Sequence, residues 1–126
     1  MKLTHNNLND LINTEDGSVE ELDCGYILDK TPLDKRDKLL GLILSKIKYN
    51  GNVMFNGLDI VDLARRHEIG EIDDDTYLTK LYTDRSSASS LELLSNALVQ
   101  NGYQLIIKRL DSNLMEYYIH ARRTKT

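Results

Sequence analysis

The chain has 126 residues, a mass of 14.5 kDa, a formal net charge of -4 at pH 7 and 40% hydrophobic residues. This length suits one domain with its own hydrophobic core, and the composition is that of a globular chain. The acidic balance gives no general basic footprint, so we do not expect duplex nucleic acid as a partner.

Cysteine content and hydrophobicity indicate a compartment. The single cysteine, Cys24, excludes an internal disulfide and fits a reducing environment, so we expect a cytoplasmic protein. The first ten residues lack the basic and apolar regions of a secretory signal, and no stretch approaches the length of a membrane span, so no membrane partner is expected. Abundant Asn, Lys, Ile and Tyr are typical of AT-rich genomes, many of them viral.

Residues 1–21 are predicted to be an irregular N-terminal segment, with a short strand at Lys2–Thr4 and a short helix or turn at 6–12. Residues 22–28 follow as a strand. Because neither face of this strand is strongly polar, we expect it to be an internal parallel strand.

A helix is predicted next, with Thr31 as its cap and Pro32 at its first position. Its apolar stripe continues to a left-handed stop at Asn50-Gly51, and a second strand follows at residues 53–55. Residues 22–60 therefore read as a βαβ unit, the building block of parallel sheets.

The remainder reads as covering helices over residues 61–102 and a β-hairpin over residues 103–123. Asp59 can cap the first of these helices. In the last strand, apolar and polar residues alternate, which predicts one buried and one exposed face. The sequence thus predicts a single α/β domain over residues 1–126, with parallel strands, an antiparallel C-terminal hairpin and helices on the faces of the sheet.

Three stretches, taken in order, resemble the C-terminal half of a class I S-adenosylmethionine-dependent methyltransferase. Residues 20–55 (EELDCGYILDKTPLDKRDKLLGLILSKIKYNGNVMF) resemble its fourth strand, the following loop and helix, and the glycine turn into its fifth strand. Residues 90–110 resemble its late helix and sixth strand, and residues 115–123 (MEYYIHARR) its antiparallel seventh strand. The glycine turn reads Asn50-Gly51-Asn52 here, so the second glycine of the family's pair is replaced. The resemblance implies a truncated Rossmann-like sheet.

The cofactor half of that family has no counterpart in the sequence. The family binds its cofactor at a glycine-rich turn after its first strand and holds the ribose with an acid after its second strand. This chain contains no G-x-G run, and Asp10 is the nearest candidate for the acid that the family often places near the adenine. We therefore expect no cofactor, and S-adenosylmethionine only if a partner supplies the missing half. No catalytic residue is assigned.

Two groups of residues are candidates for function. Open α/β sheets bind ligands at the carboxyl ends of their strands, which makes a candidate ligand or contact loop of Asp29, Lys30, Thr31, Asn56 and Asp59. For Thr31 and Asp59, helix capping is the simpler interpretation. The second group is an interface. A strand with an unpaired edge tends to associate unless the N-terminus or another chain covers it, and the helix after it carries excess leucines, so the candidate interface comprises Gly25, Tyr26, Ile27, Leu28, Leu39 and Leu42.

Metal binding is not expected, because the acidic run near Asp73–Asp75 lacks the spacing of a calcium loop and the histidines are far apart. A basic set on the hairpin could contact phosphate, or could equally face solvent or an acidic neighbouring subunit: Lys108, Arg109, Arg122, Arg123 and Lys125. The sequence thus favours a non-catalytic methyltransferase-like protein that acts through assembly, as a homo-oligomer or as a structural, viral component. The alternatives are one half of a split methyltransferase and a regulatory module that docks on a complete one.

Overall fold

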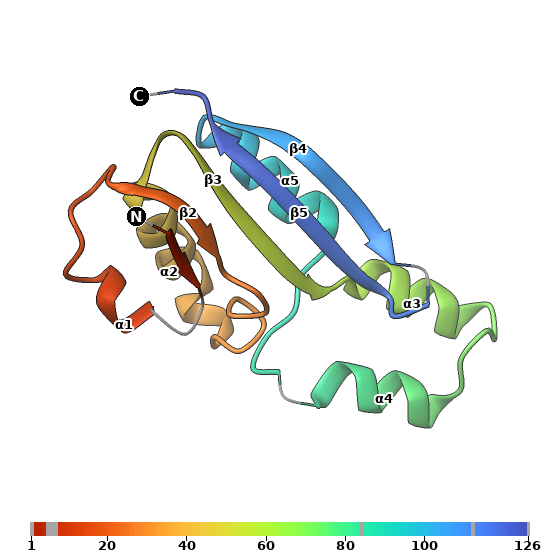
Figure 1. The fold of residues 1–126 in the computed structure, drawn as a ribbon. Helices are drawn as coiled ribbons and strands as arrows, with labels where there is room; N and C mark the ends of the chain where they lie inside the picture. The colour runs from red at the N-terminus through yellow and green to blue at the C-terminus, as the bar shows by residue number, and fades with distance from the viewer. Residues whose placement is uncertain (1, 5–7, 84, 112, 126) are drawn as a thin grey trace.

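The computed structural model describes residues 2–4, 8–83, 85–111 and 113–125. Its centre is a five-stranded sheet with the strand order β1-β2-β3-β5-β4 (Figure 1). The first three strands are parallel, and β5 runs antiparallel to both of its neighbours, β3 and β4. The strands are β1 (Lys2–Thr4), β2 (Val19–Asp23), β3 (Ile47–Leu58), β4 (Tyr103–Asp111) and β5 (Glu116–Arg123). The predicted α/β class, with parallel strands followed by an antiparallel hairpin, is confirmed.

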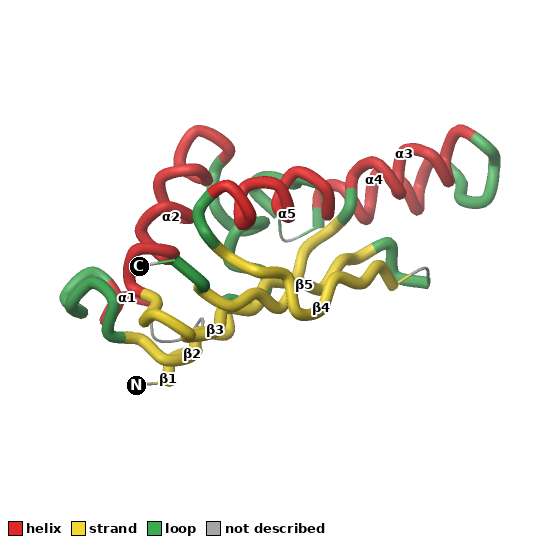
Figure 2. Tube along the Cα trace, turned by 90° about the horizontal axis from the view of Figure 1, so that it is seen from above, coloured by secondary structure: helices red, strands yellow, loops and turns green. Residues whose placement is uncertain are grey.

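The helices lie on one side of the sheet, and in the described part of the chain no helix covers the other side (Figure 2). They are α1 (Leu8–Leu11), α2 (Leu33–Lys46), α3 (Ile60–Glu68), α4 (Asp74–Tyr82) and α5 (Leu91–Gln100). None of these described helices is long and apolar enough to cross a membrane.

The main core lies between the sheet and helices α2 and α5. The sheet contributes a row of three fully buried residues to this core. The strand register places them side by side: Leu22, Val53 and Ala121. From the helices, Ile43 of α2 and Leu98 of α5 are also fully buried in this cluster. Burial of each large apolar side chain stabilises the fold by about 1.5–3 kcal/mol, so this layer holds the sheet to its helices.

Helices α3 and α4 belong to a smaller cluster around Leu58, Leu63 and Met115. Asp59 caps α3, because its Oδ1 accepts hydrogen bonds from the backbone N–H groups of Val61 and Asp62, at 3.0 Å each. This confirms the predicted cap. Helix α4 has no buried residue, so it is attached to the molecule mainly through α3.

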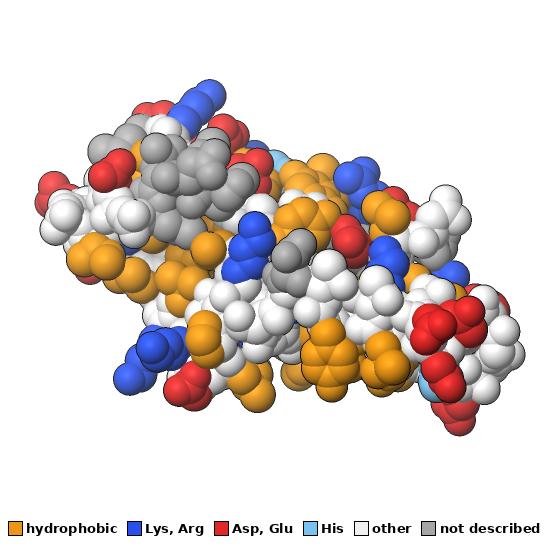
Figure 3. Space-filling view, turned by 90° about the horizontal axis from the view of Figure 1, so that it is seen from below, with side chains coloured by type: hydrophobic (Ala, Val, Ile, Leu, Met, Phe, Trp, Pro, Cys, Tyr) orange, Lys and Arg blue, Asp and Glu red, His pale blue; other side chains and the backbone are white. Residues whose placement is uncertain are grey.

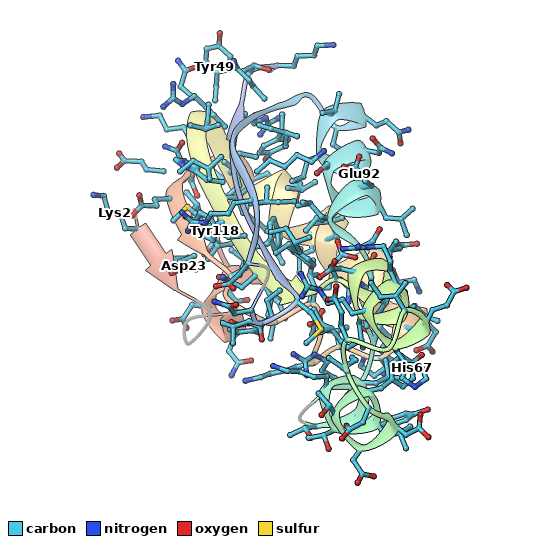
Figure 4. The ribbon with its side chains drawn as sticks, turned by 90° about the vertical axis from the view of Figure 1, so that its right-hand side faces the viewer. Lys2, Asp23, Tyr49, His67, Glu92 and Tyr118 are labelled. Carbon is cyan, nitrogen blue, oxygen red and sulfur yellow. The ribbon has the colours of Figure 1, made fainter. Side chains whose placement is uncertain are left out.

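The opposite side of the sheet, which we call the open face, presents polar and charged side chains. The register aligns Glu21, Asn52 and Arg122 in one row across β2, β3 and β5. Lys2, Asp23 and Tyr118 lie on this side, whereas Glu92 of α5 lies on the helix side (Figure 4). The other residues that the register places in this face are Met54, Asn56, Gln104, Ile107, Arg109 and His120.

The strand predicted at residues 22–28 is displaced toward the N-terminus. Residues 22–28 were expected to form it, but β2 begins at Val19 and ends at Asp23, and successive turns follow. Gly25 has a positive φ of 52°, a conformation that suits glycine, and it turns the chain away from the strand direction. Asn56 still donates its backbone N–H to the carbonyl of Gly25, so the turn remains joined to β3.

The edge of β2 is covered by the chain itself. The predicted strand at Lys2–Thr4 is confirmed, and it pairs in parallel with β2. Of the two ways to cover this edge, the N-terminal residues therefore provide the observed one.

Helix α2 is shorter than predicted. It ends at Lys46 because Ile47 already adopts an extended backbone, is fully buried and pairs with Val19. Asn50 has the expected left-handed conformation, with a φ of 66°, but it lies within β3, where the register between β2 and β3 is irregular. At the other end, Pro32 is the N-cap residue, and the hydroxyl of Thr31 donates to the carbonyl of Ile27 instead of capping α2.

Two glycines provide a matched test of packing. A Cβ at Gly57 of β3 would lie 2.7 Å from Cε2 of Tyr117, its register partner on β5. A Cβ at Gly41 in α2 would meet nothing within 4 Å. We expect Gly57→Ala to lower the free energy of unfolding by about 1–3 kcal/mol through overpacking. Gly41→Ala should raise it by about 0.5–1 kcal/mol, because alanine is the better helix former. Urea denaturation measures both, and equal effects would contradict the assigned packing of Tyr117 on Gly57.

Candidate functional site

A cleft of about 870 Å³ opens at the carboxyl ends of the first parallel strands. One wall is the segment after β2, the other is α4 with the loop that follows it, and the start of β5 closes the cleft. The lining residues are Tyr26, Asp29, Lys30, Thr79, Lys80, Thr83, Arg85, Ser86 and Glu116. The cleft therefore occupies the position where open α/β sheets bind ligands, as the sequence predicted for Asp29 and Lys30.

Asp29 is the central residue of this site, and its side chain is only 1% exposed. Its Oδ2 accepts hydrogen bonds from the backbone N–H of Leu58 at 2.9 Å and from Nε of Arg85 at 3.3 Å. Its Oδ1 accepts a hydrogen bond from Nη1 of Arg36 at 3.3 Å. Both oxygens are thus engaged, so the carboxylate ties α2, the end of β3 and the loop before α5 together.

The same loop is held through the backbone of Asp29. Its carbonyl accepts hydrogen bonds from the N–H groups of Ser86 and Ser87, at 2.7 and 3.0 Å. Arg36 donates to the carbonyl of Leu28 and to the hydroxyl of Ser87, at 3.0 Å each. This wall of the cleft is therefore built from polar contacts around one buried ion pair.

A second polar group links the cleft to β5. The hydroxyl of Tyr26 donates to Oε1 of Glu116 at 2.6 Å, and Nη2 of Arg85 lies 3.7 Å from Oε2 of the same carboxylate. The hydrogen bond to Glu116, with partial burial second, raises the pKa of Tyr26 to about 12. Tyr26 therefore keeps its proton at neutral pH and acts as a donor.

Sequence analysis did not include Arg85 and Glu116 in the site. They come from a loop and from the hairpin, 56 and 87 residues after Asp29, and only the tertiary fold brings them together. The alternation pattern of β5 assigned Glu116 to the less apolar face, which is correct, but that pattern contains no information about which loop the side chain meets.

The other three residues of the predicted ligand loop do not line the cleft. Thr31 is not a lining residue of the cleft. Asn56 lines a smaller hollow of about 120 Å³ between Tyr26 and Tyr118. Asp59 is buried, and besides capping α3 it accepts the N–H of Leu91 at 3.1 Å through Oδ2, so it joins α3 to α5. The capping interpretation of Asp59 is confirmed, and that of Thr31 is wrong.

The predicted interface residues do not form one exposed strand edge. Leu28 is 1% exposed and belongs to the core, so its inclusion was wrong, and Ile27 and Leu39 pack partly buried against that core. Tyr26 is the most accessible of the set, at 39% exposure, and Leu42 is half-buried. The displacement of β2 explains this result, because residues 25–30 fold as turns instead of continuing the strand.

The cysteine and the possible metal-ligating side chains do not form a further site among the described residues. Cys24 is fully buried, and burial raises the pKa of its thiol, which suits the expected role as a small apolar residue. Within residues 2–4, 8–83, 85–111 and 113–125, no group of three or more His, Cys, Asp or Glu side chains could hold a metal ion. Acidic side chains gather at the N-terminal end of α4, around Asp73–Asp75 (Figure 3).

The buried ion pair gives a direct test. Asp29→Asn keeps the shape of the side chain but leaves Arg36 and Arg85 without their shared carboxylate, so we expect the free energy of unfolding to fall by about 3–5 kcal/mol. The control is Asp34→Asn in the exposed first turn of α2, which should cost at most about 1 kcal/mol. Urea denaturation of both variants compares the two losses. Similar small effects would show that Asp29 does not tie the loops together.

No protein-family model matches the sequence, and a search of curated proteins finds no match. Solved structures do match the fold. A magnesium protoporphyrin IX methyltransferase from Synechocystis PCC 6803 with bound SAH aligns at a TM-score of 0.60 and 14% identity, over 90% of this chain and 48% of that one. An O-methyltransferase family protein from Burkholderia thailandensis gives 0.64 and 12%, over 94% and 34%. A SAM-dependent methyltransferase from Archaeoglobus fulgidus gives 0.58 and 14%, over 91% and 64%.

These neighbours correct one prediction. We expected no cofactor, but the fold is shared with a methyltransferase crystallised with bound SAH and with a protein named as a SAM-dependent methyltransferase, so that expectation is overturned. The two carboxylates in the cleft, Asp29 and Glu116, accept hydrogen bonds from protein donors.

The alignments cover most of this chain but only part of each solved protein. The chain is covered almost completely, whereas it spans less than two thirds of the length of each of these solved proteins. At these identities the comparison establishes the fold. The chain has the Rossmann-like fold of S-adenosylmethionine-dependent methyltransferases.

Proposed function

We propose that this chain acts through assembly, as a methyltransferase-like subunit that is not catalytic by itself and that packs its open face against a second copy. The observation that carries this proposal is the open face, which has no helix over it in the described part of the chain (Figure 2). Parallel α/β sheets normally have both faces covered, because their strands are buried on both sides. A second layer supplied by another copy completes that arrangement.

The charges of the open face are self-complementary. Glu21 and Asp23 make β2 acidic, whereas Arg122 of β5 and Arg109 of β4 make the other side basic. The strand between them, β3, contributes neutral side chains. A twofold axis that lies between the two sheets and runs parallel to β3 therefore places the acidic strand of one copy against the basic strands of the other. Such an arrangement is an isologous interface.

Apolar area is available near the centre of this face. Met54 is half-buried between Asp23 and His120 in the register, and Ile107 remains 39% exposed. Tyr118 adds an aromatic ring, over which the guanidinium of Arg109 lies at 5.0 Å from the ring centre. Aromatic and arginine side chains are common anchors of protein interfaces, so the face combines apolar contact with charge.

One sequence feature supports the non-catalytic part of the proposal, because the chain has no G-x-G run. Of the basic residues of the hairpin, Arg109 and Arg122 lie in the open face, whereas Lys108 pairs with Glu92 of the same chain and Arg123 donates to the carbonyl of Ile47. A larger particle built from several copies would need a further interface besides the open face. The abundant Asn, Lys, Ile and Tyr, typical of AT-rich genomes, many of them viral, support a role as a structural component of such a particle.

Charge reversal tests this assembly. We expect the wild type to have about twice the mass of one chain in solution. Glu21→Arg or Arg122→Glu alone should weaken association about tenfold or more, because like charges then face each other, and the double variant should restore it. Light scattering coupled to size exclusion measures the mass over a range of concentrations.

The matched control is Asp37→Arg, which changes the same charge on the exposed surface of α2, in the helix layer. Its mass should equal that of the wild type. A wild-type monomer at high protein concentration, or a double variant that stays dissociated, would contradict the proposed geometry.

A second candidate function is favoured by the position of the cleft and by the fold neighbours. In this alternative, the chain forms one half of a SAM-dependent methyltransferase, and another chain supplies the glycine-rich half. The cleft at the ends of β2 and β3 would then face the shared active site, where the segment after β2 would position Lys30 and the start of β5 would position Glu116.

Binding of S-adenosylhomocysteine distinguishes the two functions. If the chain is half of an enzyme, co-expression with an adjacent reading frame that encodes a strand followed by G-x-G should give a complex that binds the ligand about tenfold or more tightly than either part. Isothermal titration calorimetry measures this. A complex no tighter than this chain alone would refute the composite site and leave the assembly role.

A further inference from the structure

We propose that the cleft described above binds a phosphate-bearing small molecule between Lys30 and Lys80. This site is separate from the open face and goes beyond the assembly role. It is formed by one polypeptide, since both lysines line the cleft within a single copy.

The described acidic residues of the cleft are already paired. Asp29 accepts hydrogen bonds from Leu58, Arg36 and Arg85, and Glu116 accepts the hydroxyl of Tyr26 and faces Arg85. Within the described part of the chain, no ion pair or hydrogen bond involves the ammonium groups of Lys30 and Lys80.

Arg85 also lines the cleft, and its side chain is only 13% exposed. Its Nη1 donates to the carbonyls of Lys80 and Thr83, at 2.7 and 3.1 Å, and its Nε donates to Asp29. The third nitrogen, Nη2, makes no hydrogen bond to the described residues and lies 3.7 Å from Oε2 of Glu116. Arg85 is thus fixed in place with donors left for a ligand in the cleft.

Among the described residues that line the cleft, three are cations and two are carboxylates, whereas the whole chain has a net charge of -4. The described lining of the cleft is therefore more positive than the whole molecule. The hydroxyls of Thr79, Thr83 and Ser86 add donors along the wall formed by α4 and its loop. Two ammonium groups with a guanidinium suit a dianionic phosphate better than a single carboxylate.

The size of the cleft indicates that the ligand is larger than the phosphate. About 870 Å³ is within the range of small-molecule sites, and inorganic phosphate would fill only part of it. The ring of Tyr26, 39% exposed, forms an apolar wall beside the cations. The rest of the ligand can therefore lie against Tyr26 while its phosphate lies between the lysines.

The test uses inorganic pyrophosphate as the probe, in calorimetric titrations of the full chain at low ionic strength. We expect saturable binding, with one site per chain, and a loss of about tenfold or more in affinity for Lys30→Gln/Lys80→Gln, because both charges that contact the anion are removed. The matched control is Lys2→Gln/Lys48→Gln, which removes two charges from a separate hollow beside β1 and β3. Its affinity should equal that of the wild type.

Two results would overturn the proposal. One is the absence of saturable binding to the wild type, and the other is an equal loss in both double variants, which would show nonspecific attraction. Amide chemical shifts provide a readout that needs no variant, since pyrophosphate should move the signals of Tyr26 and Ser86 rather than those of Tyr49 in the other hollow. The mass of each sample is measured in parallel, so a monomeric protein that binds pyrophosphate would contradict the assembly proposal alone.

Discussion

The buried carboxylate of Asp29 is the interaction on which the functional end of the molecule depends. It accepts hydrogen bonds from the backbone of β3, from α2 and from the loop before α5, so three separate segments share one anion. A charge that is 1% exposed is stable only with such partners, because burial without them costs several kcal/mol. The carboxylate thus fixes the loop after β2 in one position, and the cleft beside it takes its shape from that position.

The arrangement of layers follows from a different constraint. The row Leu22, Val53 and Ala121 is apolar and buried under α2 and α5, whereas the register places Glu21, Asn52 and Arg122 on the open face. Antiparallel sheets tolerate one solvated face, but β2 and β3 are parallel strands of a fold that usually has two helix layers. This chain therefore combines the fold of a sheet covered on both faces with the side chains of a sheet covered on one, and for this reason we propose the open face as the surface for assembly.

Local patterns predicted most of the fold. Apolar periodicity located α5 and both strands of the hairpin, and the cap at Asp59 predicted the start of α3. The patterns failed where tertiary contacts decided the backbone. Residues 24–28 read as a strand because they are apolar, yet Gly25 turns the chain and Leu28 enters the core from a turn. The site was half predicted: Asp29 and Lys30 follow a strand, which sequence shows, but Arg85 and Glu116 reach them only through the fold.

The cleft also depends on a weakly packed element. Helix α4 has no buried residue, and its end is held by hydrogen bonds from Arg85 to the carbonyls of Lys80 and Thr83. Arg85 is in turn held by Asp29, so the position of Lys80 depends on a chain of polar contacts in addition to the packing of the partly buried Tyr77 and Leu81. Elements with few buried contacts open most easily, and ligand sites are drawn from them. An anion that joins Lys30 to Lys80 would add the missing contact across the cleft, and its binding would therefore stabilise α4 as well as the ligand.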